Sequence, residues 1–113
     1  MKTIDKQALE KLRTSGKNPL LVNVLPRDHF EQGHIPDSRS IPLASDDFEQ
    51  HVEKAAGDKG RDVVVYCANE QCDLSPQAAK RLEKAGFENV HDFTGGMEAW
   101  KQAGQPVSTG AAS

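Results

Sequence analysis

Two cysteines, Cys67 and Cys72, are the side chains in this chain best suited to covalent chemistry. Cys67 directly follows the apolar run of residues 63–66 and precedes a polar loop, residues 68–74. A helical pattern begins after this loop, at Ser75. The unpaired backbone amides of a loop and a first helical turn attract negative charge. Since the thiolate is the nucleophilic form of cysteine, this position predicts that Cys67 is a nucleophile.

Both cysteines also have alternative interpretations. Free cysteine is among the most buried residue types, so Cys67 could instead be an inert core thiol. A tightly curled loop would bring the two α-carbons within the ~4.4 to 6.8 Å that a disulfide spans. Cys72 would then protect Cys67 from over-oxidation or form a redox switch with it. Alternatively, Cys72 is only a small residue that packs the loop, and the sequence leaves both alternatives open.

The elements that must position Cys67 are strands alternating with helices. Apolar runs predict strands at residues 20–24 and 63–66. Residues 40–43 and 90–93 are predicted as two further short strands. Asp5 is expected to cap the first helix, and Ser45 or Asp46 a later one. Gly95 and Gly96 predict a tight turn from the last strand into a helix, close to the loop of Cys67. This alternation predicts an α/β fold with a parallel sheet covered by helices on both faces.

Length and composition restrict the class of protein. The 113 residues fit one domain, predicted at residues 1–107, followed by a disordered tail at residues 108–113. A net charge of −3 argues against nucleic acid or an anionic membrane as a partner. No apolar stretch approaches the roughly 20 residues that span a bilayer. The polar N-terminus lacks a secretory signal, and two cysteines are too few for a disulfide framework, which together predict a cytoplasmic protein.

Several segments in combination resemble the rhodanese domain family. Residues 30–36 match its Phe-x-x-Gly-His-Ile-Pro signature, after an apolar strand at residues 21–24. Residues 64–67 resemble the strand that delivers the active cysteine, and residues 78–87 resemble the helix behind it. Residues 95–100 resemble the closing Gly-Gly motif with its tryptophan. The resemblance extends from about residue 3 to residue 107 and implies a single rhodanese domain, with a five-stranded parallel sheet between helices.

The resemblance also implies a chemistry. In active relatives the cysteine accepts a sulfane sulfur, becomes a persulfide and passes that sulfur to a nucleophile such as cyanide or a thiol. Cys67 would be this nucleophile. The backbone amides of the following loop would bind the anionic sulfur, without a metal or other cofactor. By resemblance these amides belong to Ala68, Asn69, Glu70, Gln71, Cys72, Asp73 and Leu74.

This loop departs from the common family pattern in length and charge. Seven residues separate Cys67 from Ser75, where five are usual, and none of them is basic. Glu70 and Asp73 add negative charge that disfavours a dianionic donor such as thiosulfate. The end of the second strand carries Leu25 where the family usually has an arginine, although Arg27 lies nearby in sequence. These differences predict weak thiosulfate turnover and a wider loop with room for a bulkier donor or a protein thiol.

Related chemistries are excluded or kept by specific positions. Phosphatases with a similar loop need an arginine at the sixth position after the cysteine, where this chain has Asp73. The spacing of the histidines and cysteines does not form a zinc site, and His34 is expected to brace the loop by hydrogen bonds.

The favoured hypothesis is therefore a sulfurtransferase with a small sulfur donor and a thiol or protein acceptor. The alternative is a non-catalytic binding or redox-sensing module that uses Cys67 and Cys72, and the oligomeric state remains open.

Overall fold

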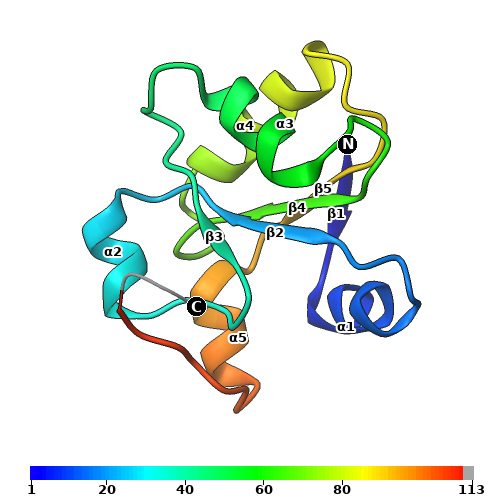
Figure 1. Cartoon of the computed structure of the whole chain (residues 1–113). Coiled ribbons are helices and arrows are strands. Elements are labelled where there is room, and N and C mark those ends of the chain that lie inside the picture. The colour runs from blue at the N-terminus through cyan, green and yellow to red at the C-terminus, as the bar shows by residue number, and fades with distance from the viewer. Residues whose placement is uncertain (111–113) are drawn as a thin grey trace.

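A computed structural model describes residues 1–110, in which five strands form one sheet (Figure 1). Every pair of neighbouring strands is parallel, and the order across the sheet is β1-β5-β4-β2-β3. The strands are β1 (Lys2–Ile4), β2 (Leu20–Asn23), β3 (Arg39–Ser40), β4 (Val63–Tyr66) and β5 (Val90–Phe93). The prediction of an α/β fold with a five-stranded parallel sheet is confirmed.

Helices cover both faces of the sheet, as predicted. They are α1 (Lys6–Thr14), α2 (Arg27–Gln32), α3 (Phe48–Ala56), α4 (Leu74–Lys84) and α5 (Gly96–Gln102). Helices α3 and α4 pack on one face, and α1 and α5 on the other (Figure 1). No helix within residues 1–110 is long and apolar enough to cross a lipid bilayer.

The central strand β4 explains why the sequence forms this layered core. Its four residues are all fully buried, and successive side chains point to opposite faces of the sheet. Val63 and Val65 belong to the core beneath α3 and α4, whereas Val64 and Tyr66 belong to the core beneath α1 and α5. A continuous apolar run is the pattern expected of a strand that is covered on both faces. The same alternation directs Cys67, the next residue, toward α4.

Three local details differ from the sequence-based expectations. Strand β1 was not predicted, because only Ile4 of its three residues is buried. Strand β3 is shorter than the predicted 40–43, although Ile41 and Leu43 still donate backbone hydrogen bonds to β2 and its extension. The N-cap of α3 is Asp47, so the prediction of Ser45 or Asp46 was wrong. The Asp5 cap of α1 is confirmed, since its side chain accepts a 2.8 Å bond from the Ala8 amide.

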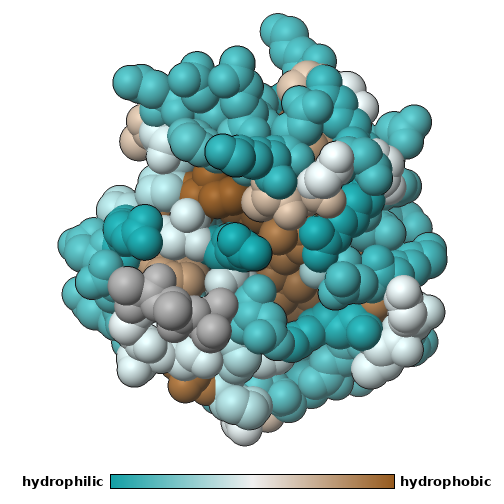
Figure 2. Space-filling model, viewed as in Figure 1, coloured by the Kyte–Doolittle hydropathy of each residue, from teal (hydrophilic) through white to brown (hydrophobic). Residues whose placement is uncertain are grey.

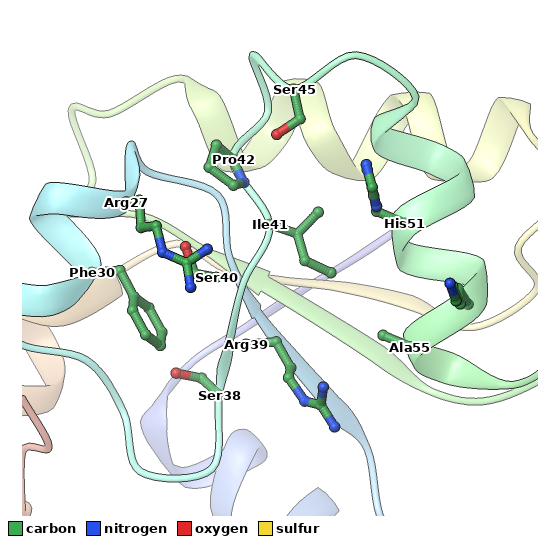
Figure 3. Close-up of a pocket in the computed structure, with 11 residues that line it drawn as sticks. Arg27, Phe30, Ser38, Arg39, Ser40, Ile41, Pro42, Ser45, His51 and Ala55 are labelled. Atoms are coloured by element: carbon green, nitrogen blue, oxygen red, sulfur yellow. The ribbon is translucent and has the colours of Figure 1, made fainter. Parts of the chain in front are cut away.

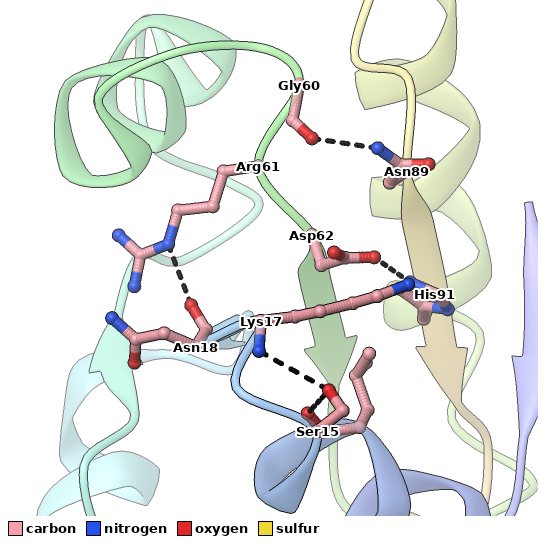
Figure 4. Close-up of polar contacts among 9 residues, drawn as sticks. Ser15, Lys17, Asn18, Gly60, Arg61, Asp62, Asn89 and His91 are labelled. Atoms are coloured by element: carbon pink, nitrogen blue, oxygen red, sulfur yellow. Dashed lines mark hydrogen bonds and ion pairs between the residues drawn. The ribbon is translucent and has the colours of Figure 1, made fainter.

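Polar contacts join the amino ends of strands β2, β4 and β5, at the end of the sheet opposite Cys67 (Figure 4). His91 on β5 lies 2.9 Å from the carboxylate of Asp62, which precedes β4. Arg61 donates to the Asn18 carbonyl before β2, at 3.0 Å. The Asn89 side chain donates to the Gly60 carbonyl at 2.8 Å. These bonds fix the register of β2, β4 and β5, and so the relative positions of their carboxyl ends.

The predicted tail begins with residues that are bonded to the domain. The backbones of His34 and Ser108 exchange two hydrogen bonds, of 2.9 and 3.0 Å. The Gly110 amide donates to the Glu31 carbonyl at 2.8 Å. Residues 108–110 therefore lie against the end of α2, whereas residues 111–113 lie outside the described residues. The domain boundary at residue 107 remains a prediction.

Candidate active site

Cys67 lies at the carboxyl end of β4, on the face of the sheet that α4 covers, and is only 1% exposed. It is joined to Cys72 by a disulfide, with the two α-carbons 6.4 Å apart. The loop is therefore curled in the way that the disulfide alternative required. The Cys67 sulfur also lies 3.5 Å from the Ser75 hydroxyl oxygen and 3.6 Å from the Cys72 carbonyl oxygen.

Asn69 organises the loop of residues 68–74. Its side-chain oxygen accepts hydrogen bonds from the amides of Gln71 (3.0 Å) and Cys72 (3.1 Å). Two of the seven amides predicted to bind the anionic sulfur are thus used within the turn itself. Among the remaining amides of the loop, those of Ala68, Asn69, Glu70 and Asp73 have no protein acceptor within residues 1–110. That these amides bind sulfur remains a prediction.

The first turn of α5 is hydrogen-bonded to the backbone at the start of the cysteine loop. The Met97 amide donates to the Cys67 carbonyl at 3.0 Å, and the Glu98 amide donates to the Ala68 carbonyl at 2.9 Å. Gly96 makes this approach possible, because it has a φ of +59° and no side chain. A Cβ atom at Gly96 would lie 2.9 Å from the Ala68 carbonyl carbon. The predicted tight glycine turn close to the loop of Cys67 is confirmed.

Two buried polar residues behind Cys67, Ser75 and Asp92, were not recognised as site residues from the sequence. Each is 1% exposed. Asp92 lies on β5 directly beside Val65 of β4, and the strand alternation places it on the same face as Cys67. Burial raises the pKa of the Asp92 carboxyl, and the nearby Ser75 hydroxyl lowers it by less. The available signal was an acidic residue inside the predicted strand of residues 90–93.

The Asp92 carboxylate is poorly partnered. Neither of its oxygens has a hydrogen-bond partner within residues 1–110. A buried carboxylate without a firm hydrogen bond or a cation costs folding free energy. This arrangement places a carboxyl group with a raised pKa close to the sulfur of Cys67.

Comparison with known proteins assigns the family. The model of the rhodanese-like domain matches residues 5–103 of the chain. The chain belongs to the rhodanese-like domain family. The family resemblance inferred from the sequence motifs is therefore confirmed.

Individual relatives support this rhodanese-like assignment. The thiosulfate sulfurtransferase GlpE of Coxiella burnetii is 33% identical over 90 residues, which cover 79% of this chain and 77% of that enzyme. An HTH-type transcriptional regulator of Mycobacterium tuberculosis is 37% identical over 91 residues, which cover 80% of this chain. The chain spans only 38% of the length of that regulator. The solution structure of a rhodanese-like domain from Anabaena has a TM-score of 0.80 at 28% identity, covering 98% of this chain and 81% of that one.

The loop of this rhodanese-like domain carries negative charge and no cation. Glu70 and Asp73 are both exposed, and neither forms an ion pair in the part of the chain that the structure describes. Arg27, the nearest candidate to replace the missing family arginine, is exposed and lies 3.7 Å from Glu31. The charge pattern of the loop therefore disfavours a dianion near Cys67.

Basic side chains gather instead in a groove of about 920 Å³ along β3 and α3 (Figure 3). Arg27, Arg39, His51 and Lys54 line it, together with apolar residues such as Ile41. Figure 2 shows apolar surface on this face of the molecule, surrounded by hydrophilic side chains. No residue of the loop 68–74 lines the groove, and neither does Cys67. This groove of the rhodanese-like domain is thus separate from its cysteine loop.

The family's Gly-His-Ile-Pro segment has a structural role here. His34 is fully buried, stacks on the Phe30 ring and shares a 2.8 Å hydrogen bond with the Phe30 carbonyl through Nδ1. The Tyr66 hydroxyl accepts a hydrogen bond from the Ile35 amide at 3.1 Å and lies 2.7 Å from the Ser38 hydroxyl. The two Tyr66 contacts attach the segment to β4. The hydrogen bonds of His34 within residues 1–110 go to Phe30 and Ser108 and not to the cysteine loop, so the expected bracing of that loop by His34 is not seen.

Proposed function

We propose that this domain is a rhodanese-type sulfurtransferase in which Cys67 carries sulfur as a persulfide. The observation that carries the proposal is the place of Cys67 at the carboxyl end of β4, where a loop with unused amides begins. Ligands of parallel α/β sheets bind beyond the carboxyl ends of the strands. The relationship to GlpE, a thiosulfate sulfurtransferase, supports a sulfur donor and a sulfur acceptor as partners.

The reaction has two displacement steps, which start from the reduced cysteines. The Cys67 thiolate attacks the outer sulfur of the donor, and a new S–S bond forms. The donor's bond to that sulfur breaks, and its electron pair leaves with the rest of the donor. An acceptor thiolate then attacks the outer sulfur of the persulfide and takes it, while Cys67 leaves as a thiolate. The amides of Ala68, Asn69 and Glu70 are candidates to stabilise the anionic outer sulfur.

Reduction of the disulfide must precede this chemistry. Cys67 is buried beneath Cys72 and bonded to it, so its sulfur cannot meet a donor in the oxidised form. A dithiol reductant would convert the disulfide to two thiols and itself become a disulfide. Cys72 is half-buried and its neighbours Gln71 and Asp73 are exposed, so a reductant would approach the disulfide from the Cys72 side. The predicted cytoplasmic location, where thiols are kept reduced, is consistent with this requirement.

The charge of the loop bears on the choice of donor. Thiosulfate is a dianion, and Glu70 and Asp73 would repel it, with no basic side chain in the loop to compensate. A donor with less charge, such as a persulfide of a small thiol or of a protein, avoids this repulsion. We expect such donors to load Cys67 faster than thiosulfate does. The acceptor is a thiol, either free or on a protein.

A second candidate function is supported by the Cys67–Cys72 disulfide. In this alternative, a peroxide oxidises Cys67 to a sulfenic acid and releases water or an alcohol. Cys72 then displaces hydroxide from that sulfur, which forms the disulfide and a second water. A non-catalytic module of this kind would sense redox state rather than transfer sulfur. The same disulfide also forms if the Cys72 thiol attacks the inner sulfur of a Cys67 persulfide and releases hydrogen sulfide.

Intact-mass analysis distinguishes these functions. The reduced protein is incubated anaerobically with thiosulfate or with glutathione persulfide, as wild type, Cys67→Ala and Cys72→Ala. Sulfur transfer predicts a gain of one sulfur atom in Cys72→Ala and none in Cys67→Ala, with glutathione persulfide reacting faster. An adduct that persists in Cys67→Ala would rule out Cys67 as the carrier. Disulfide formation by peroxide, without any sulfur adduct from either donor, would favour the redox module.

A further inference from the structure

The groove along β3 and α3 has no part in the proposed sulfur chemistry. Residues 38–42 run through it, between α2 and α3 (Figure 3). Arg27, Arg39 and Lys54 line it, and none of the described residues that line it is acidic. A smaller hollow of about 300 Å³ adjoins the groove, since Arg39 and Ala55 line both. Together the two hollows follow the outer side of β3.

The charge of these hollows is opposite to that of the whole chain, whose net charge is −3. Five of the fourteen lysines and arginines line them, because Arg13 and Arg61 line the smaller hollow. Only one of the seventeen acidic residues does so, Asp37. Arg39 and Lys54 are exposed and form no ion pair within residues 1–110. A concentration of unpaired cations on an acidic protein indicates an anionic ligand.

The backbone of β3 offers hydrogen bonds at the same place. Strand β3 stands last in the sheet order, beside β2. The Ile41 amide donates to the Asn23 carbonyl of β2 at 3.0 Å. Because neighbouring residues of a strand alternate in direction, the amide and carbonyl of Ser40 face away from β2, and Ser40 lines the groove. An extended chain can add to such an edge as a further strand, although Pro42 lacks an N–H and limits the pairing to a short stretch.

The lining of the groove favours a polypeptide over other anions. Phe30 is the one phenylalanine, tyrosine or tryptophan among the described lining residues and is 2% exposed, so the bases of a nucleic acid have no such ring on which to stack. The basic side chains come from α2, β3 and α3 and lie at separate places around the groove (Figure 3). A single phosphate would instead need several of them at one point. Ile41 and Pro42 add apolar surface, which suits the alternating side chains of a strand.

We propose that this groove binds an extended, acidic segment of a partner protein, which adds beside β3 as a further strand. Carboxylates of the segment pair with Arg39 and Lys54, and its backbone bonds the amide and carbonyl of Ser40. Its apolar side chains contact Ile41. No residue of the cysteine loop takes part, so binding does not depend on the redox state of Cys67.

The test measures the binding of a synthetic peptide to the full chain by fluorescence anisotropy. The probe is a labelled peptide of about eight residues, within the usual length of strands, that alternates valine and glutamate. We expect it to bind, and its affinity to fall as ionic strength rises. Arg39→Glu combined with Lys54→Glu should weaken binding about ten-fold, because attraction becomes repulsion. If this double variant does not fold, Lys54→Glu alone, at an exposed position of α3, should still weaken binding about three-fold.

Two matched controls isolate the charge and the backbone contributions. Lys80→Glu combined with Lys84→Glu makes the same change of charge at exposed positions of α4, outside the groove, and should leave the affinity within about two-fold. Two further peptides carry N-methyl groups on one or the other set of alternate amides. A strand pairs along one edge only at β3, so one of these peptides should lose binding and the other should keep it.

Four results would overturn the proposal. The first is no binding of the peptide, and the second is equal weakening by the groove variant and the α4 variant. The third is full binding by both N-methylated peptides, which would exclude strand addition. The fourth is a different occupant: either an oligothymidine that displaces the peptide, or a dimer of this chain that sedimentation detects and the groove variant dissociates. Peptide binding requires no sulfur donor, so its failure is distinguishable from failure of Cys67 to form a persulfide.

Discussion

Replacing Gly96 with alanine tests whether the start of α5 fixes the position of the Cys67 loop. The added Cβ would lie 3.0 Å from the Asn69 nitrogen and 2.9 Å from the Ala68 carbonyl carbon, and would overlap the Cys67 carbonyl oxygen. All these atoms belong to the backbone, so no side chain can rotate away. Two amides of α5 also hold the loop against the helix, through bonds of 3.0 and 2.9 Å. The loop or the helix must therefore move.

The expected loss of stability has two parts. A residue with a Cβ pays roughly 1–2 kcal/mol for the left-handed conformation, and Gly96 has a φ of +59°. Forcing the loop backbone away from α5 adds about 1–3 kcal/mol, the usual cost of overpacking. Their sum of about 2–5 kcal/mol is a large fraction of the roughly 5–15 kcal/mol that stabilises a typical domain. The melting temperature should fall by on the order of 10 °C or more.

Gly104→Ala is the matched control for the Gly96 variant. Gly104 has a φ of +72°, but a Cβ there would meet no atom within 4 Å. This control should lose only the conformational part, roughly 1–2 kcal/mol. Urea unfolding followed by the fluorescence of Trp100 measures both variants, and iodoacetamide alkylation of the reduced protein reports the position of Cys67. Equal losses in the two variants, with unchanged alkylation of Cys67, would refute the reasoning.

Two further predictions concern buried polar groups. Tyr66→Phe should cost about 1–3 kcal/mol in urea unfolding, because the Ile35 amide and the Ser38 hydroxyl each lose a buried partner; a loss below about 0.5 kcal/mol, typical of surface substitutions, would contradict this. Burial raises the folded-state pKa of Asp92, so its contribution to stability is fully present below the ordinary Asp pKa and is lost as pH rises through the raised value. Asp92→Asn should therefore remove this decline of the free energy of unfolding with rising pH. Urea unfolding measured from acidic to neutral pH tests this, and an identical decline in wild type and variant would contradict the assignment.

The sequence alone determined the layered architecture and the place of Cys67, the proposed nucleophile. The nearly continuous apolar runs at residues 20–24 and 63–66 are typical of strands covered on both faces, with helices between them. Cys67 is located because it follows one of these runs and precedes a polar loop. The spacing of Cys67 and Cys72 allowed a disulfide but did not require one, since loop conformation depends on the side chain of Asn69 and on contacts with α5.

Only the tertiary structure decided what lies next to Cys67. Strand β1 has too little apolar sequence to be predicted, and it forms because β5 offers an unpaired edge. Asp92 is 25 residues from Cys67 in sequence, and only the register of β5 on β4, together with the start of α4 at Ser75, brings them together. Local patterns specify which face of an element is buried, but neighbours across elements depend on strand order and register. These are properties of the assembled sheet, and no short segment of the chain contains them.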